Sequence, residues 1–117
     1  MTTTDTTKLA TKVLDLAAAL TKARGMAEAI PCEDTGGTCN FDCPQVFLPR
    51  WREADVQAAG QIAGCTVTKS QSFGGRTVYW FGGWPAAQGG NQTVKAEAFS
   101  KSMQADGYDA GVHYAMD

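Results

Sequence analysis

The sequence predicts an α+β domain, and three observations support this class. The chain has 117 residues, which is near the commonest size of a single domain. Apolar residues make up 44% of it and charged residues 19%, a balance that builds a hydrophobic core and argues against disorder. Its 13 glycines indicate many tight turns between short elements rather than a bundle of long helices. We therefore expect one domain over residues 1–117, with an N-terminal helix (1–30), a Cys/Gly-rich loop (31–44) and an α+β core (45–117).

The N-terminal segment predicts a long amphipathic helix that ends before Pro31. Its apolar residues recur at alternating steps of four and three, which places them on one helical stripe. The stripe consists of Leu9, Val13, Leu16, Leu20, Ala23, Ala27 and Ile30. The same rhythm is that of a coiled-coil seam, so it also predicts a homodimer through this helix. We favour a helix that packs on its own domain, because Ala23 and Ala27 suit close packing against a sheet.

The remainder of the chain predicts alternating strands and helices. Apolar alternation, helical spacing and turn residues indicate a strand at 45–49, a helix at 52–63, strands at 65–73 and 76–81, a helix at 93–105 and a strand at 110–116. Gly74 and Gly75 form the turn of a hairpin between the second and third strands. The order β-α-β-β-α-β is that of the split βαβ, or ferredoxin-like, arrangement, in which both helices cover one face of an antiparallel sheet. The sequence therefore predicts a ferredoxin-like core with an additional N-terminal helix.

The cysteines predict either a metal site or inert thiols. Their spacing is Cys32-x6-Cys39-x3-Cys43, followed later by Cys65. Four thiolates can close a tetrahedral zinc site, and His113 can replace one of them. Only Cys39 and Cys43 lie within the two to four residues usual for paired zinc ligands, so buried free thiols are the competing interpretation. The cofactor is accordingly either a structural zinc ion or none.

No catalytic motif is recognisable in the sequence, so the chain is expected not to be an enzyme. There is no Gly-x-Ser-x-Gly elbow, P-loop or dinucleotide fingerprint. His113 is the single histidine, and strand alternation places it on the face opposite Val112 and Tyr114. A Cys–His nucleophile pair would have to use this histidine.

The run from Arg76 to Phe81 is aromatic on both sides of a strand. Alternation sends Val78 and Trp80 to one face, and Tyr79 and Phe81 to the other. One set must pack under the helices. The other set must be covered by the first helix, by a partner protein or by stacked nucleic-acid bases.

The aromatic and arginine residues predict a binding surface for another protein, because Trp, Tyr and Arg are the preferred anchors of interfaces. The candidate residues are Arg50, Trp51, Arg52, Arg76, Tyr79, Phe81 and Trp84. The favoured function is a small non-enzymatic protein-binding module that acts as a regulator or inhibitor. The alternatives are a thiol-dependent redox protein or enzyme that uses Cys39 or Cys43, and a single-strand nucleic-acid binder that uses the aromatic strand.

Charge and hydropathy restrict the partners. The formal net charge is −2 and no basic tract is present, which argues against a nucleic-acid partner. The first apolar stretch is interrupted by Thr11, Lys12 and Asp15, so it predicts neither a signal peptide nor a membrane span. A cytoplasmic location without a membrane partner is the resulting expectation.

Overall fold

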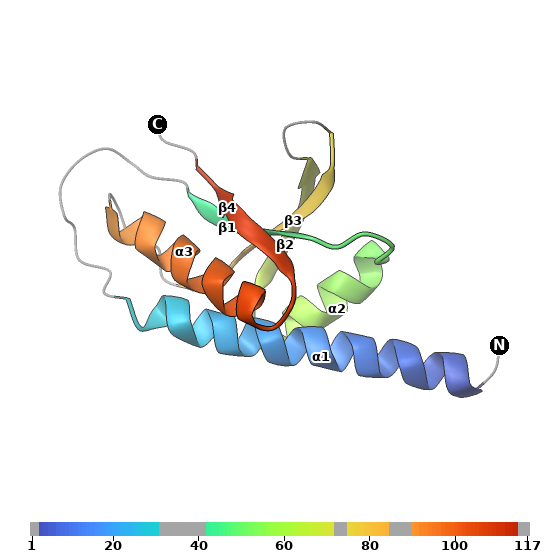
Figure 1. Ribbon diagram of the computed structural model, residues 1–117. Helices are drawn as coiled ribbons and strands as arrows, with labels where there is room; N and C mark the ends of the chain where they lie inside the picture. Colours follow the sequence, from blue (N-terminus) through green and yellow to red (C-terminus); the bar gives the residue numbers. More distant parts are fainter. Residues whose placement is uncertain (1–2, 31–41, 72–74, 85–89, 115–117) are drawn as a thin grey trace.

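The computed structural model describes residues 3–30, 42–71, 75–84 and 90–114, with the backbone alone described for 3–10 and 90–91 (Figure 1). The elements in this part of the chain are α1 (Thr3–Glu28), β1 (Cys43–Phe47), α2 (Glu53–Ala63), β2 (Thr66–Gln71), β3 (Thr77–Gly82), α3 (Gly90–Ala105) and β4 (Asp109–His113). They follow the predicted order, and the α+β class is confirmed. β1 begins at Cys43, so this cysteine belongs to a strand rather than to the predicted loop.

The four strands form one antiparallel sheet in the order β2-β3-β1-β4. β1 is the shortest of the predicted strands and yet lies at the centre, paired with β3 on one side and β4 on the other. β1 and β2 therefore run in the same direction, with β3 between them. The residues of β1 alternate between buried and half-buried, as expected for a strand with different surroundings on its two faces.

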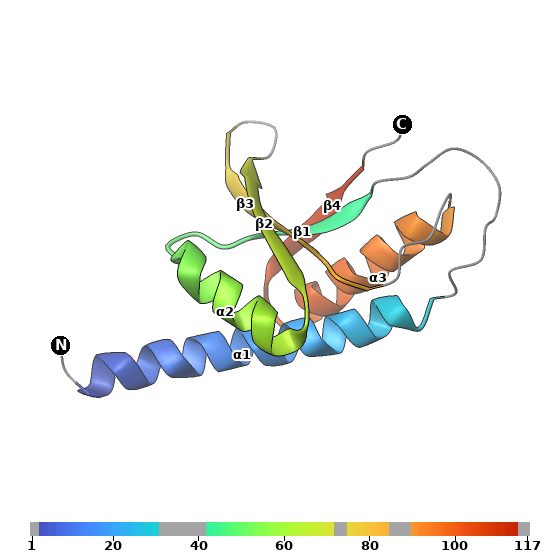
Figure 2. The same cartoon turned by 180° about the vertical axis from the view of Figure 1, so that it is seen from behind.

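Helices α2 and α3 cover one face of the sheet, and α1 lies across both helices (Figure 1). α2 contacts β2, and α3 contacts β1 and β4, whereas α1 packs on α2 and α3. The view from behind shows the same layering, with α1 outermost on the helix side (Figure 2). The first helix thus packs on its own domain as predicted, but against two helices instead of a sheet.

The predicted stripe of α1 is used inside the chain. Leu16, Leu20, Ala23 and Ala27 are all fully buried. Ala17 and Ala19 are buried beside them, because a stripe that covers two helices must be wider than a coiled-coil seam. A dimer through this stripe would require α1 to leave its own domain.

The core between the sheet and the helices is built from aromatic rings. Phe81 of β3 stacks on Phe99 of α3 with ring centroids 5.9 Å apart. Trp84 packs on the same Phe99 ring at 5.0 Å. Tyr79 lies in the same core and is 2% exposed. These rings hold α3 against β3.

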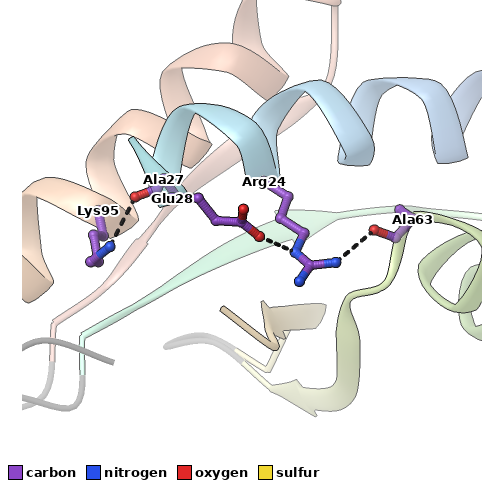
Figure 3. A network of polar contacts seen from close by, with 5 residues as sticks. All are labelled: Arg24, Ala27, Glu28, Ala63 and Lys95. Atoms are coloured by element: carbon purple, nitrogen blue, oxygen red, sulfur yellow. Dashed lines mark hydrogen bonds and ion pairs between the residues drawn. The ribbon is translucent and has the colours of Figure 1, made fainter. Parts of the chain in front are cut away.

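A buried lysine binds the carbonyl groups at the C-terminal end of α1 (Figure 3). The side chain of Lys95, from α3, is fully buried, and its Nζ donates hydrogen bonds to the carbonyl oxygens of Ala27 (3.0 Å) and Ile30 (2.7 Å). The last turn of α1 contains no basic residue of its own. A cation at this end satisfies carbonyls that have no partner within the helix and offsets the negative end of the helix dipole. Lys95 therefore ties α1 to α3.

An arginine makes the equivalent contact between α1 and α2 (Figure 3). Arg24 Nη1 donates to the carbonyl oxygen of Ala63 at 3.3 Å, and its Nε forms an ion pair of 2.6 Å with Glu28. Gly64, next to Ala63, ends α2 with a positive φ of 75°. The positive φ favours glycine at this position, whereas a Cβ there would meet only the end of the flexible Arg24 side chain, which can move aside.

Candidate interaction surface

The face of the sheet that points away from the helices carries alternate residues of all four strands. The pairing places Gln45 opposite Trp80, Phe47 opposite Val78, and Cys43 opposite His113. We call this surface the outer face. It consists of Cys43, Gln45, Phe47, Thr66, Thr68, Ser70, Val78, Trp80, Asp109, Gly111 and His113, and Arg76 extends over it from the residue before β3.

One end of the outer face is organised around Phe47. The guanidinium carbon of Arg76 lies 3.7 Å from the centroid of the Phe47 ring. Arg76 Nη2 also donates to Asp109 Oδ2 at 3.1 Å, and Asp109 is the partner of Phe47 across the β1–β4 pair. The ion pair offsets the charges of the two side chains and keeps the guanidinium over the ring.

The other end is a stack of Trp80 and His113. Their ring centroids are 4.7 Å apart and the rings are inclined by 26°. The stack crosses β1, because Trp80 belongs to β3 and His113 to β4. The Trp80 Nε1 atom is buried and finds no hydrogen-bond partner within the described residues.

A shallow depression lies at the Phe47 end of the outer face. Gly111 contributes no side chain, and a Cβ built on it would have no atom within 4 Å. The depression has a volume of about 110 Å³ and is lined by Gln45, Phe47, Arg76 and Gly111, among others. This space accommodates one small side chain of a ligand, beside Phe47 and the Arg76–Asp109 ion pair.

The thiol of Cys43, opposite His113, is in its neutral form at physiological pH. Burial raises the pKa of Cys43 to about 11, and the neighbouring Asp42 carboxylate adds to the shift. Reactive thiols need a lowered pKa, since the thiolate is the nucleophile. Cys43 therefore adds an apolar contact surface to this end of the outer face.

No described helix covers the outer face. Helix α1, one of the three covers that the sequence allowed, lies on the far side of α2 and α3 (Figure 2). The outer face also carries little charge, since Arg76 and Asp109 are its charged residues among those described and they pair with each other. No described helix therefore lies over this aromatic surface, which has no net charge among its described residues, although its Val78 is buried.

Two of the predicted binding residues need correction. Tyr79 and Phe81 are each 2% exposed and lie in the core, because the register turns them toward the helices. Trp84 is half-buried and packs on Phe99, so it supports the core. The Tyr79 and Phe81 rings cannot contact a partner while the fold is intact.

The other predicted binding residues lie in two places. Trp51 is half-buried against the core, with Lys12 Nζ of α1 4.2 Å from its ring centroid, so it belongs to the helix side. Arg50 and Arg52 flank it and are exposed. Arg76 alone of the predicted set lies on the outer face.

Sequence reasoning did not select Phe47, Trp80 and His113 as binding residues. Strand alternation did put Trp80 and His113 on definite faces of their strands, but it left open which face meets the helices. Only the pairing across β1 brings the three rings onto one surface. Their local sequences carry no signal of this.

The cysteines of the predicted zinc site are described only in part. Cys43 lies on the outer face, whereas Cys65 is 8% exposed and belongs to the core cluster. Cys32 and Cys39 lie outside the described residues. Among the residues that are described, no group of three or more His, Cys, Asp or Glu side chains comes together. The zinc site stays a prediction.

Comparison with known protein families, curated proteins and solved structures finds no match for this chain. No described helix has the length and hydropathy needed to cross a membrane. The function must accordingly be argued from the outer face.

Proposed function

We propose that this chain is a small non-enzymatic protein-binding module that holds a segment of another protein against the outer face of its sheet. The observation that carries the proposal is the surface from Phe47 to His113, which is aromatic, without net charge and uncovered by any described helix. Such a surface resembles the centre of a protein interface, where aromatic residues and arginine are enriched and unpaired charges are depleted. By occupying a segment of its partner, the module would act as a regulator or inhibitor.

The expected ligand is an extended polypeptide segment with a small apolar side chain. That side chain fills the depression beside Gly111, at the Phe47–Arg76 end of the outer face. This contact adds specificity to the burial of apolar area against the half-buried Phe47 and Trp80 rings.

A polypeptide suits this surface better than a single-stranded nucleic acid. Stacking platforms for bases work together with basic grooves that bind the phosphates. On the outer face, the guanidinium of Arg76 is already engaged with Asp109. The thiol alternative is also disfavoured for Cys43, whose pKa is raised to about 11. Cys39 lies outside the described residues.

We further propose that the core has the ferredoxin-like arrangement. The order β2-β3-β1-β4, the antiparallel pairing of all neighbours and the position of α2 and α3 on one face support it. An experimental structure in which β1 is not between β3 and β4 would contradict it.

The function is tested by selecting peptides from a random 12-residue display library against the full chain under reducing conditions. We expect the selected peptides to carry a small apolar residue and to bind through the outer face. The decisive variant is Gly111→Val, which fills the depression without a clash and suits a strand. We expect it to weaken peptide binding at least tenfold, measured by isothermal titration calorimetry.

The matched control is Ile62→Ser, which removes an exposed apolar side chain on α2, where 59% of the residue is accessible. It should leave binding unchanged. Peptides that tolerate Gly111→Val but lose affinity with Ile62→Ser would refute the outer face as the site. Salt-dependent quenching of tryptophan fluorescence by oligo(dT), abolished by Gly111→Val, would assign the surface to nucleic acid instead.

A further inference from the structure

A second apolar surface lies on the helix side, in a groove between α1 and α3. The groove has a volume of about 440 Å³, and its apolar lining includes Met26 from α1 and Val94, Ala98 and Ala105 from α3. Met26 is 53% exposed and Val94 is 45% exposed, and the two line the same groove, so they form one apolar patch rather than isolated surface residues. We call it the α1/α3 groove. It is separate from the outer face, which lies across the sheet.

The residues that α3 contributes to the groove lie on one stripe of the helix. Val94, Ala98, Lys101 and Ala105 follow one another at steps of four, three and four, and Glu97 borders them. A large residue therefore stands at the N-terminal end of the stripe and a small one at its C-terminal end. An acidic and a basic residue lie between these ends.

We propose that the α1/α3 groove binds a second copy of this chain, with the two α3 helices packed antiparallel about a two-fold axis. In a two-fold interface the same surface must complement itself. Placing Val94 over Ala105 of the second copy fits a large side chain above a small one. The axis then passes between positions 98 and 101, so the small Ala98 of each helix faces Lys101 of the other and leaves room for its aliphatic stem.

The charges are complementary about the same axis. The placement of Val94 over Ala105 brings Glu97 of each copy beside Lys101 of the other, twice per dimer. Neither side chain forms an ion pair within the described residues, so both are available for this contact. Met26 of α1 borders the Val94 end of each groove and is covered by the second copy. This contact uses the exposed side of the helix layer and leaves the buried stripe of α1 in its own domain.

Sedimentation velocity of the full chain in reducing buffer, from about 1 µM to 1 mM, tests the dimer. We expect the weight-average mass to rise with concentration toward twice the chain mass. Glu97→Lys should raise the dissociation constant at least tenfold, because it faces Lys101 of the second copy. Lys101→Glu should have the same effect, and the double variant should return to within about threefold of the original value.

The Glu97→Lys variant separates this contact from an effect of overall charge. The chain carries a net charge of −2, so this substitution lowers the general repulsion between two copies. General charge alone would therefore strengthen the dimer, whereas the proposed contact predicts weakening. Gln61→Lys, on the exposed surface of α2, is the control for an added positive charge outside the groove. Circular dichroism verifies that each variant is folded.

The proposal is overturned by a chain that stays monomeric at all concentrations, or by a dimer that neither Glu97→Lys nor Val94→Ser weakens. A monomer that instead binds an amphipathic helical peptide, with loss of binding in Val94→Ser, would assign the groove to another protein. Gly111→Val should leave the mass unchanged, so a failure here is distinguishable from a failure of the binding function of the outer face.

Discussion

The two faces of the sheet are made by the same strands and carry similar side chains, yet the helices bury only one of them. On the helix face, Val46 is fully buried and Phe81 is 2% exposed. On the outer face, Phe47 and Trp80 are only half-buried, and no described helix lies over them. Aromatic content alone therefore does not distinguish a core from a binding surface. The layer that packs on each face makes the difference.

The two cysteines that the structure describes also lie on different sides of the sheet. Cys65 lies on the helix side in the core, and Cys43 lies on the outer face beside His113. Burial raises the pKa of both thiols to about 11. The half-buried Cys43 reaches the same pKa as the buried Cys65 because the Asp42 carboxylate adds to the effect of burial.

The largest expected contrast between the faces is in stability. Phe81→Ala should lower the free energy of unfolding by about 3–5 kcal/mol, since it leaves a cavity against Phe99. Trp80→Ala should cost less than half as much, because its ring is only half-buried. Urea denaturation of both variants measures the difference. Equal losses would mean that the outer face is as tightly packed as the core.

Lys95 tests whether the helix side depends on a buried charge. Lys95→Met keeps the length of the side chain but removes its hydrogen bonds to Ala27 and Ile30, and should cost about 3 kcal/mol. Lys69→Met is the control, because that side chain is 49% exposed and its ion pair with Glu53 is 3.9 Å long. The control should change stability by at most about 0.5 kcal/mol. Thermal unfolding measures the stability of both variants. If they lose the same amount of stability, Lys95 makes no special contribution.

A pH series compares the thiols of the two faces. The unfolded thiols ionise near pH 9, whereas the folded ones hold their protons until about pH 11. Because the unfolded chain releases protons first, the stability contributed by each thiol is present below pH 9 and is lost as the pH rises to 11. We expect a loss of about 2 kcal/mol for each thiol. The raised pKa of Tyr79, caused by burial and then by Glu53, acts in the same direction.

Urea denaturation at pH 8 and pH 10.5 with reductant measures the loss, and Cys65→Ala and Cys43→Ala should each reduce it. The difference between the two pH values is compared within each variant, so any change in packing cancels. If a variant that lacks both cysteines loses as much stability as the original chain, the tyrosines dominate and the thiol assignment is wrong.

Much of the local structure could be predicted from the sequence. The spacing of Leu16, Leu20, Ala23 and Ala27 predicted the buried side of α1, because helical periodicity alone determines which residues share a stripe. Turn residues such as Gly64 and Gly107 predicted where α2 and α3 end. The order of the elements along the chain and both aromatic sets of β3 could also be predicted, since these depend on spacing within each segment.

The contacts between elements could not be predicted from the sequence. Lys95 resembles an ordinary surface lysine until α1 places its last carbonyl groups above it. Cys43 and His113 are 70 positions apart in the printed chain and become neighbours only through the pairing of β1 with β4. The sequence-based choice of Tyr79 and Phe81 as binding residues failed for the same reason.

The sequence by itself thus determined the class of the domain, the order of its helices and strands, and the two aromatic sets of β3, because these depend on spacing within a segment. The tertiary structure decided which set became core and which became surface. That choice depends on where α2 and α3 pack, and the free energy of that packing is shared by residues far apart in the chain. A pattern with period two is unchanged when the faces are exchanged, so only the covering helices could break the symmetry.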